Sequence, residues 1–197
     1  GYSIGAGDLN ADNKSDIIVG APYNDTAAPD AGAAYVVYGG NLTGNISLAD
    51  ADIKRTGEAK NDLAGYAVAS AGNTTTGVGE EWLVGAPGND SAGENAGAVY
   101  YISGNATGVT SLAYADVTFA GESAGDRAGS VVASAEDFDG DNRSDIMVGA
   151  PWSNASGPNA GAAYVLTDVD VPDDSALANA SLVLRGVSPQ AMAGWAV

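Results

Sequence analysis

The chain has 197 residues, of which 25 are acidic and 7 basic, so its formal charge is −18. This charge excludes nucleic acid as a partner, because phosphate binding needs a footprint of lysine and arginine, and it argues against anionic membrane surfaces. The chain contains neither cysteine nor histidine, which removes disulfides, thiolate metal sites and the commonest general base. No apolar run is long enough for a membrane span, so this segment is not expected to insert into a membrane.

Short β-strands are the elements that the sequence predicts, in chain order from the N-terminus. Alternating or apolar runs bounded by Gly, Pro, Asn and Asp are typical of strands, and the first 64 residues contain four such runs. They are Tyr2–Ala6, Asp16–Gly20, Ala33–Tyr38 and Ile53–Thr56. No segment has a sustained helical periodicity.

The same pattern then repeats along the rest of the chain. "VGAP" occurs at residues 19–22, 84–87 and 148–151, and an "AGAAYVV"-like run follows each time, from Ala31, Ala96 and Ala160. A Gly-Tyr-like element keeps the same step at residues 1, 65, 129 and 194. The sequence therefore predicts one domain of three full repeats, at approximately 1–64, 65–128 and 129–193, with 194–197 starting a fourth.

Four strands in a repeat of about 64 residues indicate an all-β fold made of β-propeller blades, each with four antiparallel strands. A solenoid of another type is the weaker alternative. Closed propellers have four to eight blades, so three blades and the start of a fourth are expected to be part of a larger propeller. Further blades of the same chain are the favoured source of the remainder, and a second copy of the chain is the alternative.

Two repeats contain an aspartate-rich loop just before "VGAP", with oxygen-bearing side chains at loop positions 1, 3, 5 and 9. Such alternating oxygens can converge on a hard cation the size of Ca²⁺, whereas Mg²⁺ prefers fewer carboxylates and more water. The residue at position 7 is expected to contribute its backbone carbonyl while its side chain points to solvent. The predicted ligands are Asp8, Asn10, Asp12, Lys14 (carbonyl) and Asp16 in the first loop, and Asp137, Asp139, Asp141, Arg143 (carbonyl) and Asp145 in the third.

A solvated turn is the alternative interpretation of each loop, because the whole chain is acidic. Recurrence at the same distance from "VGAP" favours the cation. In the second repeat the same positions hold Asn73, Thr75, Gly77 and Glu81, which make a poor Ca²⁺ site, so two sites are expected and none in the second blade.

The other recurring residues are interpreted as structural. The glycine of "GAP" is expected to adopt a backbone conformation closed to other residues, and the prolines Pro22, Pro87 and Pro151 are expected to end their strands. The repeated tyrosines, Tyr35, Tyr100 and Tyr164, and the tryptophans Trp82 and Trp152 are expected to pack in the core or between blades.

These motifs in register, the Gly-Tyr-like element, the aspartate loop and "GAP", resemble the FG-GAP repeat of integrin α-subunit β-propellers over the whole chain. The resemblance implies Ca²⁺-binding hairpins in only some blades and an extracellular or cell-surface location. The composition, with many Asp and few Lys, is similar to that of proteins from extreme halophiles, which suggests a haloarchaeal or other prokaryotic surface protein. Candidate glycosylation sequons outside the cation loops start at Asn24, Asn41, Asn45, Asn73, Asn89, Asn105, Asn154 and Asn179.

Two classes of function remain open. The first is a non-catalytic, calcium-stabilised extracellular module for adhesion or surface assembly, which binds a protein or glycan. The alternative is the accessory propeller of a larger secreted hydrolase, such as a phospholipase or a polysaccharide-active enzyme. Neither interpretation makes this segment an enzyme, and a catalytic carboxylate pair such as Glu80 with Glu81 has no support in the sequence.

Overall fold

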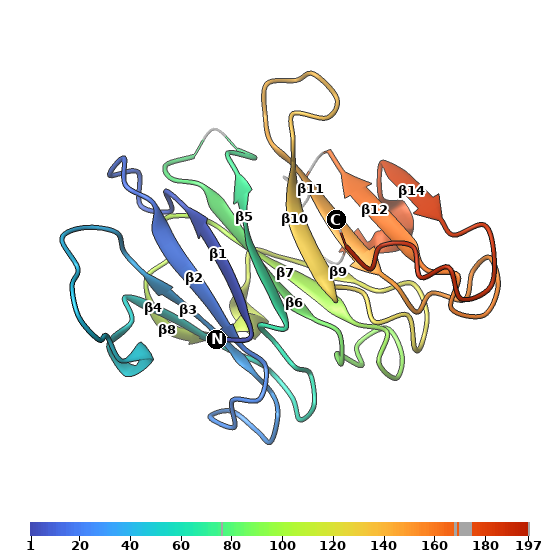
Figure 1. The fold of residues 1–197 in the computed structure, drawn as a ribbon, viewed down its shortest axis with the longest axis horizontal. Coiled ribbons are helices and arrows are strands. Elements are labelled where there is room, and N and C mark those ends of the chain that lie inside the picture. Colours follow the sequence, from blue (N-terminus) through green and yellow to red (C-terminus); the bar gives the residue numbers. More distant parts are fainter. Residues whose placement is uncertain (76, 168, 170–174, 197) are drawn as a thin grey trace.

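The computed structural model describes residues 1–75, 77–167, 169 and 175–196. Short strands arranged in three antiparallel sheets dominate it, together with single turns of 3-10 helix, so the predicted all-β class is confirmed (Figure 1). In the described part of the chain, no helix is both long and apolar enough to cross a membrane. Val197, which was predicted to lie in the next blade, falls outside the described residues.

The three sheets follow one another along the chain, and each is an antiparallel meander. The first contains β1 (Ser3–Gly7), β2 (Asp16–Ala21), β3 (Ala33–Val37) and β4 (Ile53–Thr56). The second contains β5 (Ala67–Gly72), β6 (Glu81–Ala86), β7 (Ala98–Ile102) and β9 (Val117–Ala120). The third contains β10 (Val131–Glu136), β11 (Asp145–Ala150), β12 (Ala162–Leu166) and β14 (Leu182–Arg185).

Two additional strands, which the sequence did not reveal, extend the first two sheets. β8 (Gly108–Ser111) comes from the second repeat but pairs in parallel with β4 of the first sheet. In the same way β13 (Ser175–Ala176), from the third repeat, pairs in parallel with β9. A single turn of 3-10 helix directly follows β8 and β13, and a third turn lies at the corresponding place in the first repeat. These turns are η1 (Leu48–Asp50), η2 (Leu112–Tyr114) and η3 (Leu177–Asn179). The second and third blades therefore each add a strand to the outer edge of the blade before them.

The hydrophobic core lies between the sheets, in two layers. One layer joins the first and second sheets and includes Ile18, Ile53 and Trp82. The other joins the second and third sheets and includes Leu83, Phe119 and Ile146. Because successive residues of a strand point to opposite faces, the middle sheet is buried on both sides, and every residue of β6 and β7 is buried. The predicted packing of Tyr100, Tyr164 and Trp82 between sheets is confirmed.

The glycine of "GAP" has a different role from the one predicted. Gly20, Gly85 and Gly149 do not have the positive φ that favours glycine. Instead, a Cβ on them would lie only 2.0, 2.0 and 2.1 Å from the backbone carbonyl oxygens of Gly65, Gly129 and Gly194. Glycine is therefore needed because the backbone of the next repeat passes directly beside it. The positive φ belongs to those partner glycines, at +82°, +81° and +78°.

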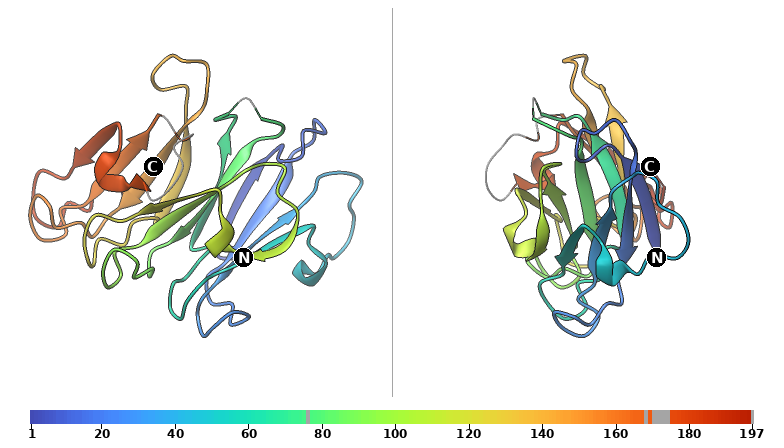
Figure 2. Two further views of the ribbon diagram at one scale, coloured as in Figure 1. Left: turned by 180° about the vertical axis from the view of Figure 1, so that it is seen from behind. Right: turned by 90° about the vertical axis from the view of Figure 1, so that its left-hand side faces the viewer.

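The strand ends place two sets of residues on opposite sides of the molecule. The hairpins that join the first and second strands of each sheet project on one side, at the top of Figure 1 and of the left view of Figure 2. The Gly-Tyr-like elements and "GAP" lie at the other ends of the same strands, and β2, β6 and β11 each end at the alanine before proline, as predicted. Between them, the first strands β1, β5 and β10 line a hollow of about 650 Å³.

Candidate metal centre and aromatic pocket

The aspartate hairpin of the third blade connects β10 to β11 and brings three of its predicted ligands together. Carboxylate oxygens of Asp137, Asp139 and Asp145 all lie within 4.8 Å of one another. Backbone amides hold this arrangement, because Asp137 accepts from Gly140 N (2.7 Å) and Asp145 Oδ2 accepts from Phe138 N (2.7 Å). This acidic cluster could hold a metal ion.

Asp145 supplies the observation that tests whether an ion fits there. Its side chain is fully buried, and among the described residues its Oδ1 atom has no hydrogen-bond partner. A buried carboxylate oxygen without a partner is costly, and a bound cation is one way to satisfy it. Burial raises the pKa of Asp145, and the nearby carboxylates of Asp139 and Asp141 raise it further. The residues present therefore fit a hard divalent cation.

The first hairpin, between β1 and β2, has the same backbone but a different side-chain arrangement. Asp8 accepts from the amides of Asp12 (3.0 Å) and Asn13 (2.8 Å), and Asn13, like Asn142 in the third hairpin, has a positive φ. Here, however, both oxygens of Asp16 accept backbone amides, from Leu9 (2.9 Å) and Gly39 (2.7 Å). In the first hairpin both carboxylate oxygens of the last aspartate are therefore hydrogen-bonded, whereas in the third Oδ1 of Asp145 has no partner among the described residues.

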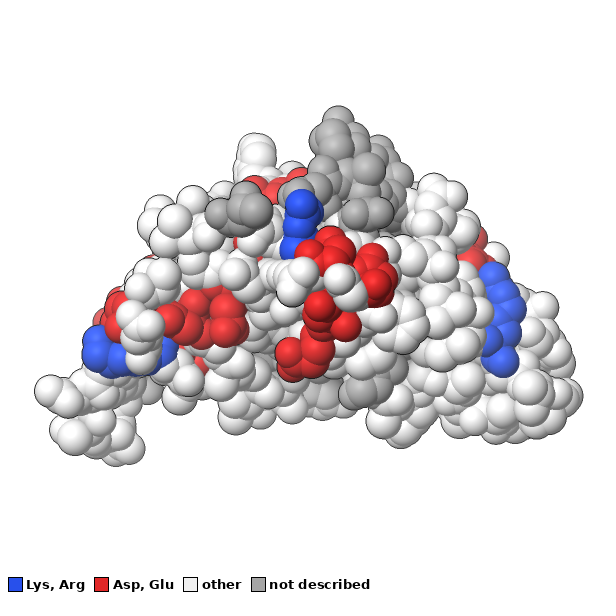
Figure 3. Space-filling view, turned by 90° about the horizontal axis from the view of Figure 1, so that it is seen from above, with Lys and Arg blue, Asp and Glu red and all other residues white. Residues whose placement is uncertain are grey.

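The side chain at position 7 of each hairpin was predicted to point to solvent, and the structure corrects this prediction. Lys14 Nζ lies 2.7 Å from Asp12 Oδ2, and Arg143 Nε lies 3.7 Å from Asp141 Oδ2. In each loop the basic side chain therefore pairs with the aspartate at position 5, and the hydrogen bond from Lys14 lowers the pKa of Asp12. A cation in either loop would compete with this pairing. Figure 3 views the hairpin side of the molecule, where acidic side chains gather in patches and basic ones are few.

In the hairpin of the second blade, the carboxylate at position 9, that of Glu81, is satisfied by hydrogen bonds within the hairpin. Glu81 is buried and accepts hydrogen bonds from Thr74 N (2.9 Å), Thr74 Oγ1 (2.9 Å) and Thr75 Oγ1 (2.5 Å). Hydroxyl groups thus occupy the oxygens that a metal would need. The neighbouring Glu80 accepts from Ser70 Oγ (2.6 Å), so the two glutamates point to separate partners.

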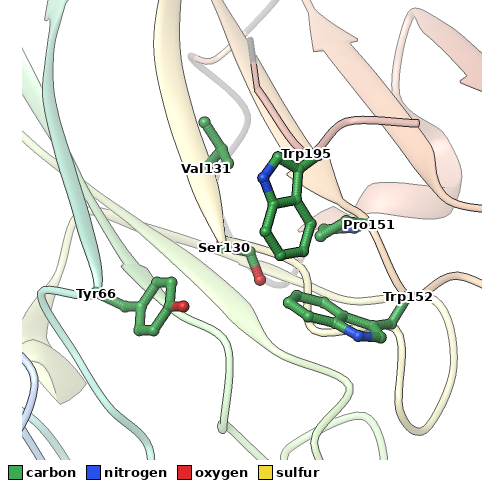
Figure 4. Close-up of a pocket in the computed structure, with 6 residues that line it drawn as sticks. All are labelled: Tyr66, Ser130, Val131, Pro151, Trp152 and Trp195. Carbon is green, nitrogen blue, oxygen red and sulfur yellow. The ribbon is translucent and has the colours of Figure 1, made fainter. Parts of the chain in front are cut away.

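An aromatic pocket lies at the opposite ends of the strands, and the sequence analysis did not identify it. Its volume is about 180 Å³, and it is lined by Tyr66, Ser130, Val131, Pro151, Trp152 and Trp195 (Figure 4). The rings of Trp152 and Trp195 are 5.3 Å apart, and the guanidinium of Arg127 lies 5.3 Å from the Trp152 ring. Trp152 is only half-buried, so it lines a surface pocket rather than the core.

The aromatic side chains occur at corresponding positions of different repeats. Tyr2, Tyr66 and Trp195 each follow the glycine of the Gly-Tyr-like element, and Tyr23 and Trp152 each follow "GAP". Tyr2 of the first blade packs against Tyr66 of the second blade and Tyr23 of its own blade, with ring centroids 4.7 and 6.1 Å apart, respectively. The signal that could have predicted this site is the recurrence of aromatic residues at two positions that lie at the same ends of the strands.

Most of the candidate sequons lie at exposed or half-exposed positions, and their modification stays a prediction. Asn89 does not fit, because it is buried and its side-chain amide donates to the hydroxyl of Tyr100 (3.2 Å). That hydroxyl in turn donates to Glu58 (2.6 Å) in the link between the first two blades. Asn89 is therefore part of the packing between blades.

The three sheets, their repeated hairpins and their inter-sheet cores define a propeller-type module. A family model described as FG-GAP repeat matches residues 1–37 and 128–166, which contain the two aspartate hairpins. The chain therefore contains FG-GAP repeats, as the motifs predicted. Comparison with curated proteins gave no match.

Proposed function

We propose that the chain is a non-catalytic, calcium-stabilised extracellular module that binds a protein or glycan at the cell surface. The observation that carries this proposal is the acidic cluster of the third hairpin, with the unpartnered buried oxygen of Asp145. Calcium is the ion of choice because the hairpin offers several oxygens in a loop, and FG-GAP repeats often bind it. The ion would be held by Asp137, Asp139, Asp141, Asp145 and the carbonyl of Arg143, and in the first blade by Asp8, Asn10, Asp12, Asp16 and the carbonyl of Lys14.

The ligand surface that we propose is the aromatic pocket, on the side away from the hairpins. Exposed aromatic rings beside a cation and a few hydroxyl groups suit a sugar ring or a protein side chain. The alternative, an accessory propeller of a secreted hydrolase, would use the same surfaces. The FG-GAP repeat family is typically non-catalytic, and FG-GAP repeats occur in extracellular proteins, which supports this class of function in both cases.

Binding at the pocket can be followed by tryptophan fluorescence during titration with a panel of oligosaccharides and surface glycoproteins. Trp152→Ala is expected to weaken binding about tenfold or more, because loss of a central aromatic contact costs at least about 1.4 kcal/mol. Tyr114→Ala, which changes an exposed aromatic residue of the middle blade, is the control and should bind normally. Hydrolysis of ester or glycoside substrates by the purified chain would contradict the proposal.

The proposed halophilic origin predicts that salt stabilises the fold even in chelator. Two Ca²⁺ ions would change the formal charge only from −18 to −14 (−18 + 4), so repulsion persists outside the hairpins. Added KCl screens this repulsion, and the melting temperature should therefore rise from low to molar salt. A melting temperature that stays flat over this range would contradict the halophile interpretation.

A further inference from the structure

The aromatic residues around the Gly-Tyr-like elements form a row that follows the order of the blades. Tyr23 contacts Tyr2, and Tyr2 contacts Tyr66 of the second blade, with ring centroids 6.1 and 4.7 Å apart. In the third blade Trp152 contacts Trp195, with ring centroids 5.3 Å apart. Among the described residues no ring contact joins Tyr66 to Trp152, so the row is interrupted between the second and third blades.

A serine stands at the interruption, where the repeat pattern has an aromatic residue. Ser130 follows the glycine of the third Gly-Tyr-like element, and the other three elements have a tyrosine or tryptophan at this position. The pocket of about 180 Å³ lies here, because Ser130 lines it together with Tyr66 on one side and Trp152 on the other (Figure 4). Pockets for drug-sized ligands measure roughly 300 to 1,000 Å³, so this smaller one suits a single ring. A ligand ring that inserted there would complete the row.

A cation lies beside the pocket without an ion-pair partner. The Arg127 guanidinium is 5.3 Å from the centre of the Trp152 ring, and among the described residues no carboxylate pairs with it. Arg127 has a positive φ of +54°, and its carbonyl accepts hydrogen bonds from the amide and the hydroxyl of Ser130 (3.2 and 2.6 Å). The corresponding residues after β4 and β14 are the apolar Leu63 and Met192, whose carbonyls accept the equivalent backbone hydrogen bond. The charge is therefore present where the row of rings is interrupted.

The rings and the guanidinium together determine the chemistry of a ligand that fits. The faces of aromatic rings are electronegative, so they attract the C–H face of a sugar ring. A guanidinium donates two parallel hydrogen bonds to a carboxylate. In a chain with a formal charge of −18, an unpaired arginine beside a pocket offsets the repulsion that an anionic ligand would meet elsewhere on the surface.

We propose that the pocket binds the ring of an acidic sugar, a uronic acid, whose C–H face packs on Trp152 and whose carboxylate pairs with Arg127. This inference rests on the proposed function, which makes the pocket the ligand surface, and it names the class of ligand. The occupant is an acidic sugar rather than an aromatic side chain of a protein, because such a side chain would fill the gap but leave the guanidinium unpaired.

Titration with two small glycosides, followed by tryptophan fluorescence, tests the proposal. Methyl glucuronide and methyl glucoside have the same ring and differ in the carboxylate, and their small size limits repulsion from the acidic chain. Of the three tryptophans, Trp82 is buried in the core, so changes in emission report on Trp152 and Trp195. We expect the wild-type chain to bind the glucuronide at least about tenfold more tightly than the glucoside, because hydrogen bonds to a charged group contribute at least that factor.

Three variants separate the charge from the gap in the row. Arg127→Leu introduces the side chain that Leu63 has at the corresponding position, so the fold should tolerate it, and the affinity for the glucuronide should fall to that for the glucoside. Ser130→Tyr supplies the missing ring and should abolish binding of both glycosides, with circular dichroism as the check that it folds. Lys60→Leu removes the same charge from an exposed position that does not line the pocket, and it should keep the wild-type preference.

The outcomes distinguish this inference from the proposed function on which it rests. Equal affinities of the wild-type chain for the two glycosides, or a preference for the glucuronide that survives Arg127→Leu, would overturn the acidic-sugar proposal and leave the pocket as a ligand surface. Binding of neither glycoside would also overturn it. A surface glycoprotein whose binding is weakened by Trp152→Ala would in that case still support the proposed function, whereas loss of this effect too would count against both.

Discussion

Replacing Gly85 by alanine is expected to destabilise the fold strongly, because there is no room for a methyl group at this position. The new Cβ would lie 2.0 Å from the carbonyl oxygen of Gly129 and 2.9 Å from its carbonyl carbon. Both are backbone atoms, so no side chain can rotate away, and the second and third blades would have to separate. We expect a loss of about 3 kcal/mol or more in the free energy of unfolding, measured by denaturant titration.

Gly40→Ala is the matched control for this substitution. No atom lies within 4 Å of the Cβ that it would add, and Gly40 is not among the residues with positive φ. Its effect should stay within about 1 kcal/mol of wild type, in the stabilising direction, because alanine restricts the unfolded chain. If Gly85→Ala unfolds at the wild-type denaturant midpoint, the close packing of neighbouring blades through their glycines is wrong.

Calcium is expected to raise the stability of the wild-type chain. The Asp139→Ala substitution is expected to remove the part of this stabilisation that comes from the ion in the third hairpin. At a concentration about 100 times the dissociation constant, one bound ion contributes about 2.7 kcal/mol to the free energy of unfolding. Asp139 is exposed, so its loss should leave the fold intact while it removes one carboxylate of the cluster. In chelator the variant should be at least as stable as wild type, because fewer like charges are crowded together.

Thermal melts with calcium and with chelator distinguish this effect from a general change in charge. Glu94→Ala removes the same charge from an exposed position outside the hairpins. Its melting temperature should rise on addition of calcium by as much as that of the wild type. Asp139→Ala should keep only the gain that comes from the first hairpin. An equal calcium gain in Asp139→Ala and wild type would show that the third hairpin is not a calcium site.

The positions of the main strands followed from the sequence because their signals are local. Alternation and turn residues predicted Ile53–Thr56, which agrees with β4, and Asp16–Gly20, which lies within β2. The cross-sheet strand β8 could not be found in this way. Its residues, Gly108–Ser111, are stabilised by an edge that belongs to another repeat, and no local pattern encodes that pairing.

The candidate site was predictable as a set of positions and less so as an arrangement of side chains. Spacing placed Asp137, Asp139 and Asp145 in one hairpin, where the structure brings their oxygens together. The hydrogen bond of Lys14 to Asp12 depends on rotamers, which spacing does not determine. The pocket around Trp152 was missed because its second tryptophan, Trp195, is brought to it by the packing of one repeat against the next.

Calorimetric titration of the metal-free chain with Ca²⁺ tests the central claim most directly. The two aspartate hairpins predict two bound ions per chain, with dissociation constants on the order of 10⁻⁴ to 10⁻³ M. No third ion is expected in the hairpin of the second blade, because threonine hydroxyls already donate to its Glu81. A chain that binds no Ca²⁺ at millimolar concentration would contradict the account of this protein as a calcium-stabilised module.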